Sequence, residues 1–157
     1  MKGLLVVLLL AFAPARAQVA ATHPREGARG VAVLLADSGA VAWARTAQAL
    51  ATLGYRVQER DSAAGRLGTE AWFIEGQAQC LTSVEALVLG HTVLLTGTSY
   101  CPLFHHKPLP VYYSATSHVP FANFDCFAWG WAEVNVVARA LGGRKTVWLP
   151  RVPRMPK

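Results

Sequence analysis

The chain has 157 residues, of which 53% are hydrophobic and five are tryptophans. This supply of apolar residues suits a well-filled core in a single domain of ordinary size. Lysine and arginine exceed aspartate and glutamate by 15 to 9, a modest net charge of +6. No segment after the first 17 residues resembles a membrane-spanning helix, so a retained N-terminal anchor is the alternative to a chain without any membrane span.

The first 17 residues predict a secretory signal peptide. Lys2 supplies the positive charge, residues 4–12 form an unbroken apolar run, and Ala15-Arg16-Ala17 is a small-x-small cleavage site. We therefore expect an exported protein, periplasmic or secreted, with no transmembrane segment after cleavage. Removing Lys2 and Arg16 leaves 13 basic and 9 acidic residues, a net charge of +4.

A leader or linker is expected over residues 18–30, which lack periodicity and carry Pro and Gly. Next, residues 31–35 form the short apolar run of a buried strand. Asp37 and Ser38 are placed to cap a following helix, and Gly54 to end it. Residues 55–58 resume as a strand, which completes a β-α-β unit. The apolar face expected for this helix consists of Val41, Trp43, Ala47, Leu50 and Leu53.

The middle of the chain predicts further alternation of strands and helices. Residues 71–76 and 91–96 are expected strands, and Thr82 with Glu85 matches a capping box that would open a helix ending at Gly90. Prolines punctuate residues 97–110, which are therefore expected to be irregular.

The C-terminal part predicts a closing strand–helix–strand segment. Residues 111–113 and 146–149 are the expected strands. A helix is expected between them, beginning near Cys126 and ending at Gly142-Gly143, with Trp131, Val134, Ala138 and Leu141 at helical spacing. Together these patterns predict an α/β fold: a layered domain of β-α-β units over residues 31–149, with a mixed sheet and a Pro-rich irregular insertion. A basic, Pro-rich tail follows over residues 150–157.

A family resemblance comes from two stretches of the chain. VAVLLADSGAVAWARTAQALATLGYRV resembles the beginning of the LytR C-terminal type of envelope domain, in which an Ala/Arg-rich helix ending in LxxLGY stands between two strands. VYY, AEVNVVARALGG and TVWLP are similar to that family's closing strand–helix–strand. The match covers about 30–60 and 110–150, with 61–109 as an insertion; alternatively, 71–96 supplies the second half and 97–157 is an extension. The resemblance implies a non-catalytic accessory module of the cell envelope and carries over no catalytic residues.

The C-terminal end of the chain is strongly basic, because every charged residue after Glu133 is Lys or Arg. Such an end attracts an acidic partner, although a solvated tail that serves only solubility is the alternative. For an exported protein, we expect an anionic envelope polymer or an envelope protein rather than nucleic acid. The candidate binding residues are Arg139, Arg144, Lys145, Arg151 and Arg154.

Cys80, Cys101 and Cys126 predict a disulfide, since exported proteins mature in an oxidising compartment. Cys101–Cys126 is the preferred pair because both residues border the Pro-rich insertion. Closing that loop of about 25 residues would stabilise the fold by about 3.5 kcal/mol. Cys80–Cys101 is the competing pair.

Two alternative chemistries use the same region. Cys101, His105, His118 and Cys126 could supply the four ligands of a zinc ion, although their spacing matches no standard finger. FDCFAWGWAEV also resembles the nucleophile helix of cysteine-dependent cell-wall peptidases, with Cys126 as nucleophile and His118 as base. However, Phe127-Ala128 replaces the Ser-Gly of that motif and no histidine follows Cys126. The sequence therefore predicts a non-catalytic binding protein without a cofactor, with a Cys/His hydrolase or zinc protein as the alternative.

Overall fold

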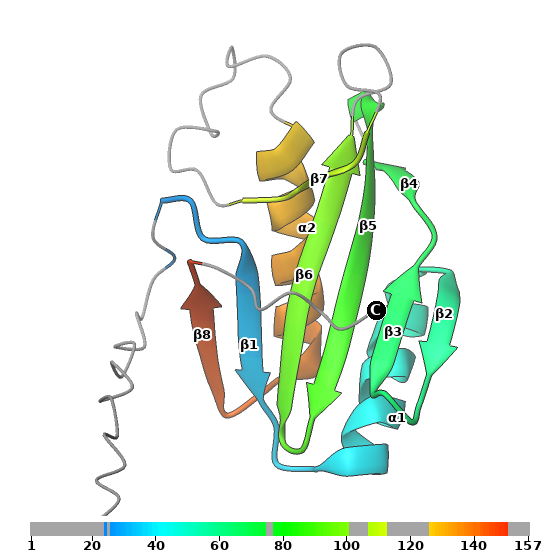
Figure 1. Ribbon diagram of the computed structural model, residues 1–157, viewed down its shortest axis with the longest axis vertical. Coiled ribbons are helices and arrows are strands. Elements are labelled where there is room, and N and C mark those ends of the chain that lie inside the picture. The colour runs from blue at the N-terminus through cyan, green and yellow to red at the C-terminus, as the bar shows by residue number, and fades with distance from the viewer. Residues whose placement is uncertain (1–23, 25, 75–76, 101–106, 113–125, 151–157) are drawn as a thin grey trace, which may run out of the picture.

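The computed structural model describes residues 24, 26–74, 77–100, 107–112 and 126–150. These residues form one eight-stranded sheet and two helices (Figure 1). The helices are α1 (Gly39–Thr52) and α2 (Cys126–Leu141). The strands are β1 (Gly30–Leu34), β2 (Val57–Asp61), β3 (Arg66–Thr69), β4 (Trp72–Ile74), β5 (Gln77–Leu89), β6 (Thr92–Tyr100), β7 (Leu109–Pro110) and β8 (Lys145–Leu149).

The sheet is antiparallel at every described pairing, in the order β2-β3-β5-β6-β1-β8, with β4 beside β5 and β7 beside β6. The predicted α/β fold of β-α-β units is therefore wrong. β1 and β2 flank α1 in the chain, but β6, β5 and β3 lie between them in the sheet. An antiparallel sheet with its helices on one face belongs to the α+β class.

The long β5–β6 hairpin is the main reason for this difference. Its register runs from Leu81 opposite Tyr100 to Leu89 opposite Thr92. Gly90 and His91 form the two-residue turn between the strands, and Gly90 adopts the positive φ of 59° that such a turn requires. The predicted helix over residues 82–90 is wrong, because residues 80–88 lie in β5 and alternate between buried and partly covered positions, as a strand with one buried face requires. The expected irregular segment at residues 97–100 is also wrong, since β6 continues to Tyr100.

Both helices cover the same face of the sheet, behind the strands as Figure 1 is drawn. Alternate residues of β1, β5 and β6 point toward them, and neither of the two described helices lies on the other face. Gly130 brings α2 close to the sheet, because a Cβ at that position would overlap Ser99 Oγ, Val111 and Thr82. The fully buried core includes Val31, Val33, Leu50, Val84, Val93, Leu95, Val134, Val137 and Leu141.

Helix α1 agrees with its predicted span and with most of its predicted apolar face: Leu50 is buried, and Trp43, Ala47 and Leu53 pack against the core. Val41 is the exception. Gly54 ends it at φ 84°, as expected. The buried positions are Ala42, Thr46 and Leu50, whereas Val41 is 61% exposed. Ser38 occupies the N-cap without a side-chain hydrogen bond, so the predicted capping by its hydroxyl is wrong.

The remaining predictions divide between described and undescribed residues. The strands near residues 71–76 and 146–149 and the helix that ends before Gly142-Gly143 are confirmed by β4, β8 and α2. The strand expected at residues 111–113 is wrong for Val111 and Tyr112, which follow the short strand β7 but belong to no strand themselves. Tyr113 lies outside the described residues. The same holds for residues 1–17 and 151–157. Neither described helix combines the length and the apolar character that a membrane span requires.

Candidate functional site

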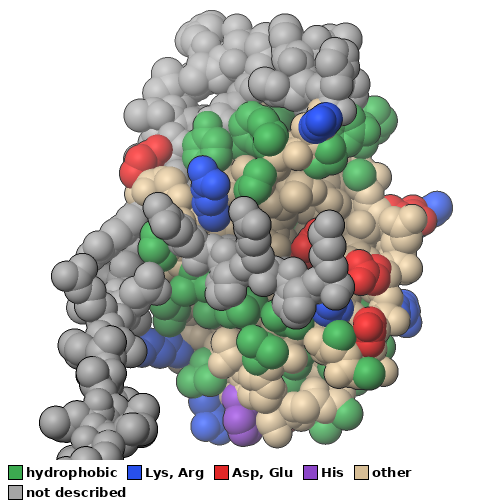
Figure 2. Space-filling view, in the orientation of Figure 1, with side chains coloured by type: hydrophobic (Ala, Val, Ile, Leu, Met, Phe, Trp, Pro, Cys, Tyr) green, Lys and Arg blue, Asp and Glu red, His purple; other side chains and the backbone are tan. Residues whose placement is uncertain are grey.

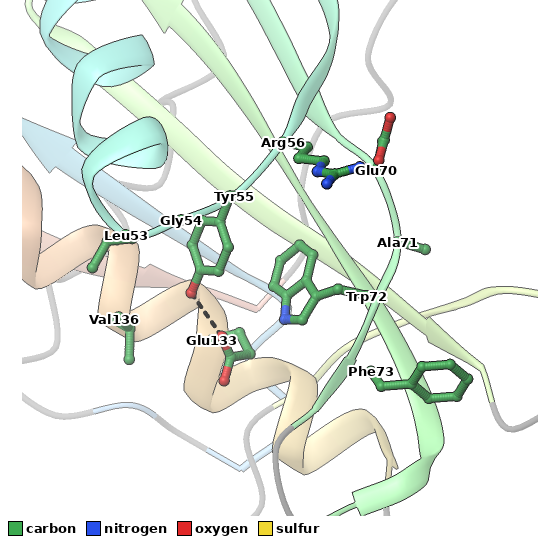
Figure 3. A pocket seen from close by; sticks show the side chains of 10 residues that line it. All are labelled: Leu53, Gly54, Tyr55, Arg56, Glu70, Ala71, Trp72, Phe73, Glu133 and Val136. Atoms are coloured by element: carbon green, nitrogen blue, oxygen red, sulfur yellow. Dashed lines mark hydrogen bonds between the residues drawn. The ribbon is translucent and has the colours of Figure 1, made fainter.

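A hollow of about 420 Å³ opens between the end of α1, strand β4 and the middle of α2 (Figure 3). The α1–β2 connection contributes residues 53–56, the segment entering β4 contributes residues 70–73, and α2 contributes Glu133 and Val136. The backbone holds these segments together, because the Glu70 N–H donates to the carbonyl of Arg56 at 2.8 Å. We call this site the aromatic hollow.

One wall of the aromatic hollow is a stacked pair of rings. The ring centroids of Tyr55 and Trp72 lie 4.3 Å apart, with 24° between the ring planes. Both residues are half-buried and pack against the main core. Stacking on the core fixes the two side chains, so the wall is preformed rather than assembled by a ligand.

A phenol–carboxylate hydrogen bond crosses the inner end of the aromatic hollow. The Tyr55 hydroxyl donates to Oε2 of Glu133 at 2.6 Å. Burial raises the pKa of Tyr55 well above its usual range, and the neighbouring carboxylate of Glu133 raises it further. The phenol is therefore a proton donor throughout the physiological pH range.

The rim of the aromatic hollow carries the other charged groups. Figure 3 shows the side chains of Arg56 and Glu70 turned toward each other at one edge, while Phe73 points away. Phe73 is 58% exposed, which is high for so large an apolar side chain. The same view shows the indole nitrogen of Trp72 on the side of the ring that faces Glu133.

A second surface lies at the end of the domain where several connections meet. The Gly39 N–H donates to the carbonyl of Gly90 at 3.0 Å, and the Arg144 N–H donates to the carbonyl of Leu34 at 2.8 Å. These bonds join the β1–α1 connection, the β5–β6 turn and the α2–β8 connection. Figure 2 shows Lys and Arg side chains beside a histidine at this lower edge.

Arg45 pairs with a carboxylate and with the C-terminal end of α2 at this end of the domain. Its guanidinium donates to Oδ2 of Asp37 at 2.9 Å and to the carbonyl of Leu141, the last residue of α2, at 2.8 Å. The second bond satisfies a carbonyl that the helix leaves unpaired and offsets its negative end. The negative charge of Asp37 is therefore balanced by Arg45, so it does not offset the charge of other Lys and Arg side chains at this end of the domain.

Three of the predicted binding residues share this end of the domain. Arg139 lies in the last turn of α2, Arg144 in the following turn, and Lys145 begins β8. All three are exposed, and none has an acidic partner within the described residues. We call Arg139, Arg144 and Lys145 the basic end. Arg151 and Arg154 lie outside the described residues.

The disulfide joins Cys80 to Cys126, with a Cα–Cα distance of 5.3 Å, so the predicted Cys101–Cys126 pair is wrong. The bond ties β5 to the start of α2, and both cysteines are buried beside Ile74. Sequence reasoning chose the wrong partner because it placed Cys80 outside any long strand, whereas β5 carries it alongside α2.

This disulfide also bears on the alternative chemistries. Cys126 begins α2 as predicted, but a sulfur bonded to Cys80 is not the thiolate that a nucleophile or a zinc ligand requires. Cys101, His105 and His118 lie outside the described residues. Over the described ranges, no three His, Cys, Asp or Glu side chains converge as a possible metal site.

No protein-family model matches the chain, and no curated protein has a significantly similar sequence. Fold and surfaces define a small, disulfide-bonded α+β domain with an aromatic hollow and a separate basic end.

Sequence reasoning missed the aromatic hollow entirely. Tyr55 was assigned to a strand, Trp72 to another, and Glu133 served only to mark where the basic end begins. The three residues are far apart in the chain, and no spacing motif connects them. Only the packing of α2 against the end of α1 and β4 brings them together.

Proposed function

We propose that this is an exported, non-catalytic binding protein of the cell envelope, which contacts an anionic polymer through its basic end. The observation that carries the proposal is the exposed charge of Arg139, Arg144 and Lys145, for which the described part of the chain provides no acidic partner. Asp37 lies near them, but Arg45 already pairs with it. A polymer with repeated negative charges meets several exposed cations at once, which favours its binding over that of a single small anion.

Export is supported by two features of the chain. The chain contains a buried disulfide, Cys80–Cys126. Because disulfides persist mainly in oxidising compartments outside the cytosol, this bond favours export. The N-terminal 17 residues have the charge and apolar pattern of a signal peptide. The resemblance to the LytR C-terminal type of envelope domain suggests the same cellular location and an accessory role.

Binding of dextran sulfate, measured over a range of salt concentrations, tests the proposal. The test variant carries Arg139→Gln, Arg144→Gln and Lys145→Gln. We expect its affinity to fall, and the slope of log K against log salt to become about 2 units shallower, at about 0.7 per lost contact as for single-stranded polyanions. The reason is that each charge contact releases a condensed counterion.

A matched control removes the same total charge elsewhere: Arg29→Gln, Arg60→Gln and Lys107→Gln, all at exposed positions. We expect this variant to keep nearly the wild-type slope. Equal effects of the two triple variants would mean that net charge alone drives binding. That result, or salt-independent binding by the wild type, would refute the assignment to the basic end.

A further inference from the structure

The aromatic hollow contains a carboxylate, Glu133, for which the described residues supply no cationic partner. Glu133 is half-buried, and its one partner within the described residues is the neutral hydroxyl of Tyr55, which contacts Oε2. Arg56 also lines the hollow, but Figure 3 shows it at the rim and turned toward Glu70. The rim therefore holds one charge of each sign, and the inner part holds one negative charge.

The same inner part is lined by aromatic rings. The face of an aromatic ring is electron-rich and attracts cations, and the indole ring of tryptophan does so most strongly. Tyr55 and Trp72 stack on each other within contact of the core, so neither has to reorganise when a ligand binds. A cation against the face of Trp72 that Tyr55 does not cover would be attracted by the ring, and the carboxylate of Glu133, beyond the indole nitrogen, would attract the same charge.

The volume suits a small ligand or a single side chain. About 420 Å³ falls within the usual range for ligand sites and exceeds the space of several water molecules. The apolar wall provided by Leu53 and Val136 is suited to the carbon atoms that surround an organic cation. A bare metal ion would leave this wall unused.

We propose that the aromatic hollow binds an organic cation, an alkylammonium group, with Trp72 against its charge and Glu133 as counter-charge. This function is separate from the basic end, which attracts anions. A free small amine and a lysine side chain of a peptide share this chemistry. The two sources differ in whether an amide backbone flanks the ammonium group.

Titration with choline, followed by the ¹⁵N-indole NMR signals of the five tryptophans, tests the proposal. Trp72→Phe assigns the signal of Trp72. We expect choline to shift that signal in a saturable manner, and 3,3-dimethyl-1-butanol, its neutral isostere, to bind at least tenfold more weakly. A parallel titration with Nα-acetyl-lysine amide distinguishes the sources: a tighter fit than choline points to a peptide side chain, a weaker fit to a free amine.

Two variants that each remove one negative charge show where in the aromatic hollow the cation binds. Glu133→Gln keeps an acceptor for the Tyr55 hydroxyl and should weaken choline binding about tenfold, because a charge-assisted contact becomes a neutral one. Glu70→Gln removes the same charge from the rim and should change binding less than twofold. Equal binding of choline and its isostere, equal effects of the two variants, or no shift of the Trp72 signal with either cation would overturn the proposal.

Discussion

Breaking the disulfide between Cys80 and Cys126 should remove a large share of the free energy of unfolding. The bond closes a loop with a sequence separation of 46. In the chain-entropy description, cross-linking a loop of that length stabilises the fold by about 4 kcal/mol at 25 °C, since it restricts the unfolded chain. Small domains have about 5–15 kcal/mol in total, so the reduced protein should be marginally stable.

Urea unfolding of the oxidised and the reduced wild type measures this quantity directly. Reduction keeps both side chains in place, so the difference isolates the cross-link. The double variant Cys80→Ala and Cys126→Ala should lose about 1–2 kcal/mol more, because both sulfurs are buried and their removal leaves unfilled space. Cys101→Ala is the control and should unfold like the wild type, since it leaves the Cys80–Cys126 bond intact.

Two results would refute this reasoning. One is a reduced protein less than about 1 kcal/mol weaker than the oxidised protein, which would mean that the unfolded chain is already compact around this loop. The other is a peptide map of the oxidised protein that joins Cys101 to Cys126, as the sequence predicted.

Further predictions concern Tyr55 and Gly130. Tyr55→Phe should cost about 1.5–3 kcal/mol in urea unfolding, because the half-buried carboxylate of Glu133 loses its hydrogen bond; a cost below about 0.5 kcal/mol would contradict the role of that bond. The pKa of Tyr55 is raised in the folded state, so its contribution is present below about pH 10 and is lost as pH rises further. The stability difference between the wild type and Tyr55→Phe should therefore shrink above about pH 10, and a constant difference would refute the raised pKa. Gly130→Ala should destabilise the fold by about 1–3 kcal/mol despite the better helix propensity of alanine, because the new Cβ would overlap Ser99 and Val111; a stabilised variant in thermal unfolding would show that α2 can move away from β6.

Local patterns in the sequence predicted several elements correctly, for physical reasons that act within a few residues. Gly54 and Gly142 end α1 and α2 in the left-handed conformation that glycine adopts without strain. The helical spacing of Trp131, Val134, Ala138 and Leu141 appears as the buried face of α2. Helix ends and helical spacing depend on residues that are close together in the chain, so they do not depend on how the strands pair.

The same local reasoning failed where a pattern fits two structures. Thr82 and Glu85 match a capping box, yet they lie in the long strand β5, in which residues 80–88 alternate between buried and partly covered positions. The hydrogen bonds that decide the matter come from β6, across the Gly90 turn. Thr82 donates its hydroxyl to the carbonyl of Thr98 there, and it begins no helix.

The sequence by itself determined the basic character of the C-terminal end, the helix that begins at Cys126, and the presence of cysteines suited to a disulfide. Only the tertiary structure decided which strands pair, that Cys80 is the partner of Cys126, and that Tyr55, Trp72 and Glu133 line one hollow. The physical reason is that charge, capping and periodicity act over a few residues. Strand pairing and a binding hollow depend on contacts between segments whose separation in the chain leaves no mark on local composition.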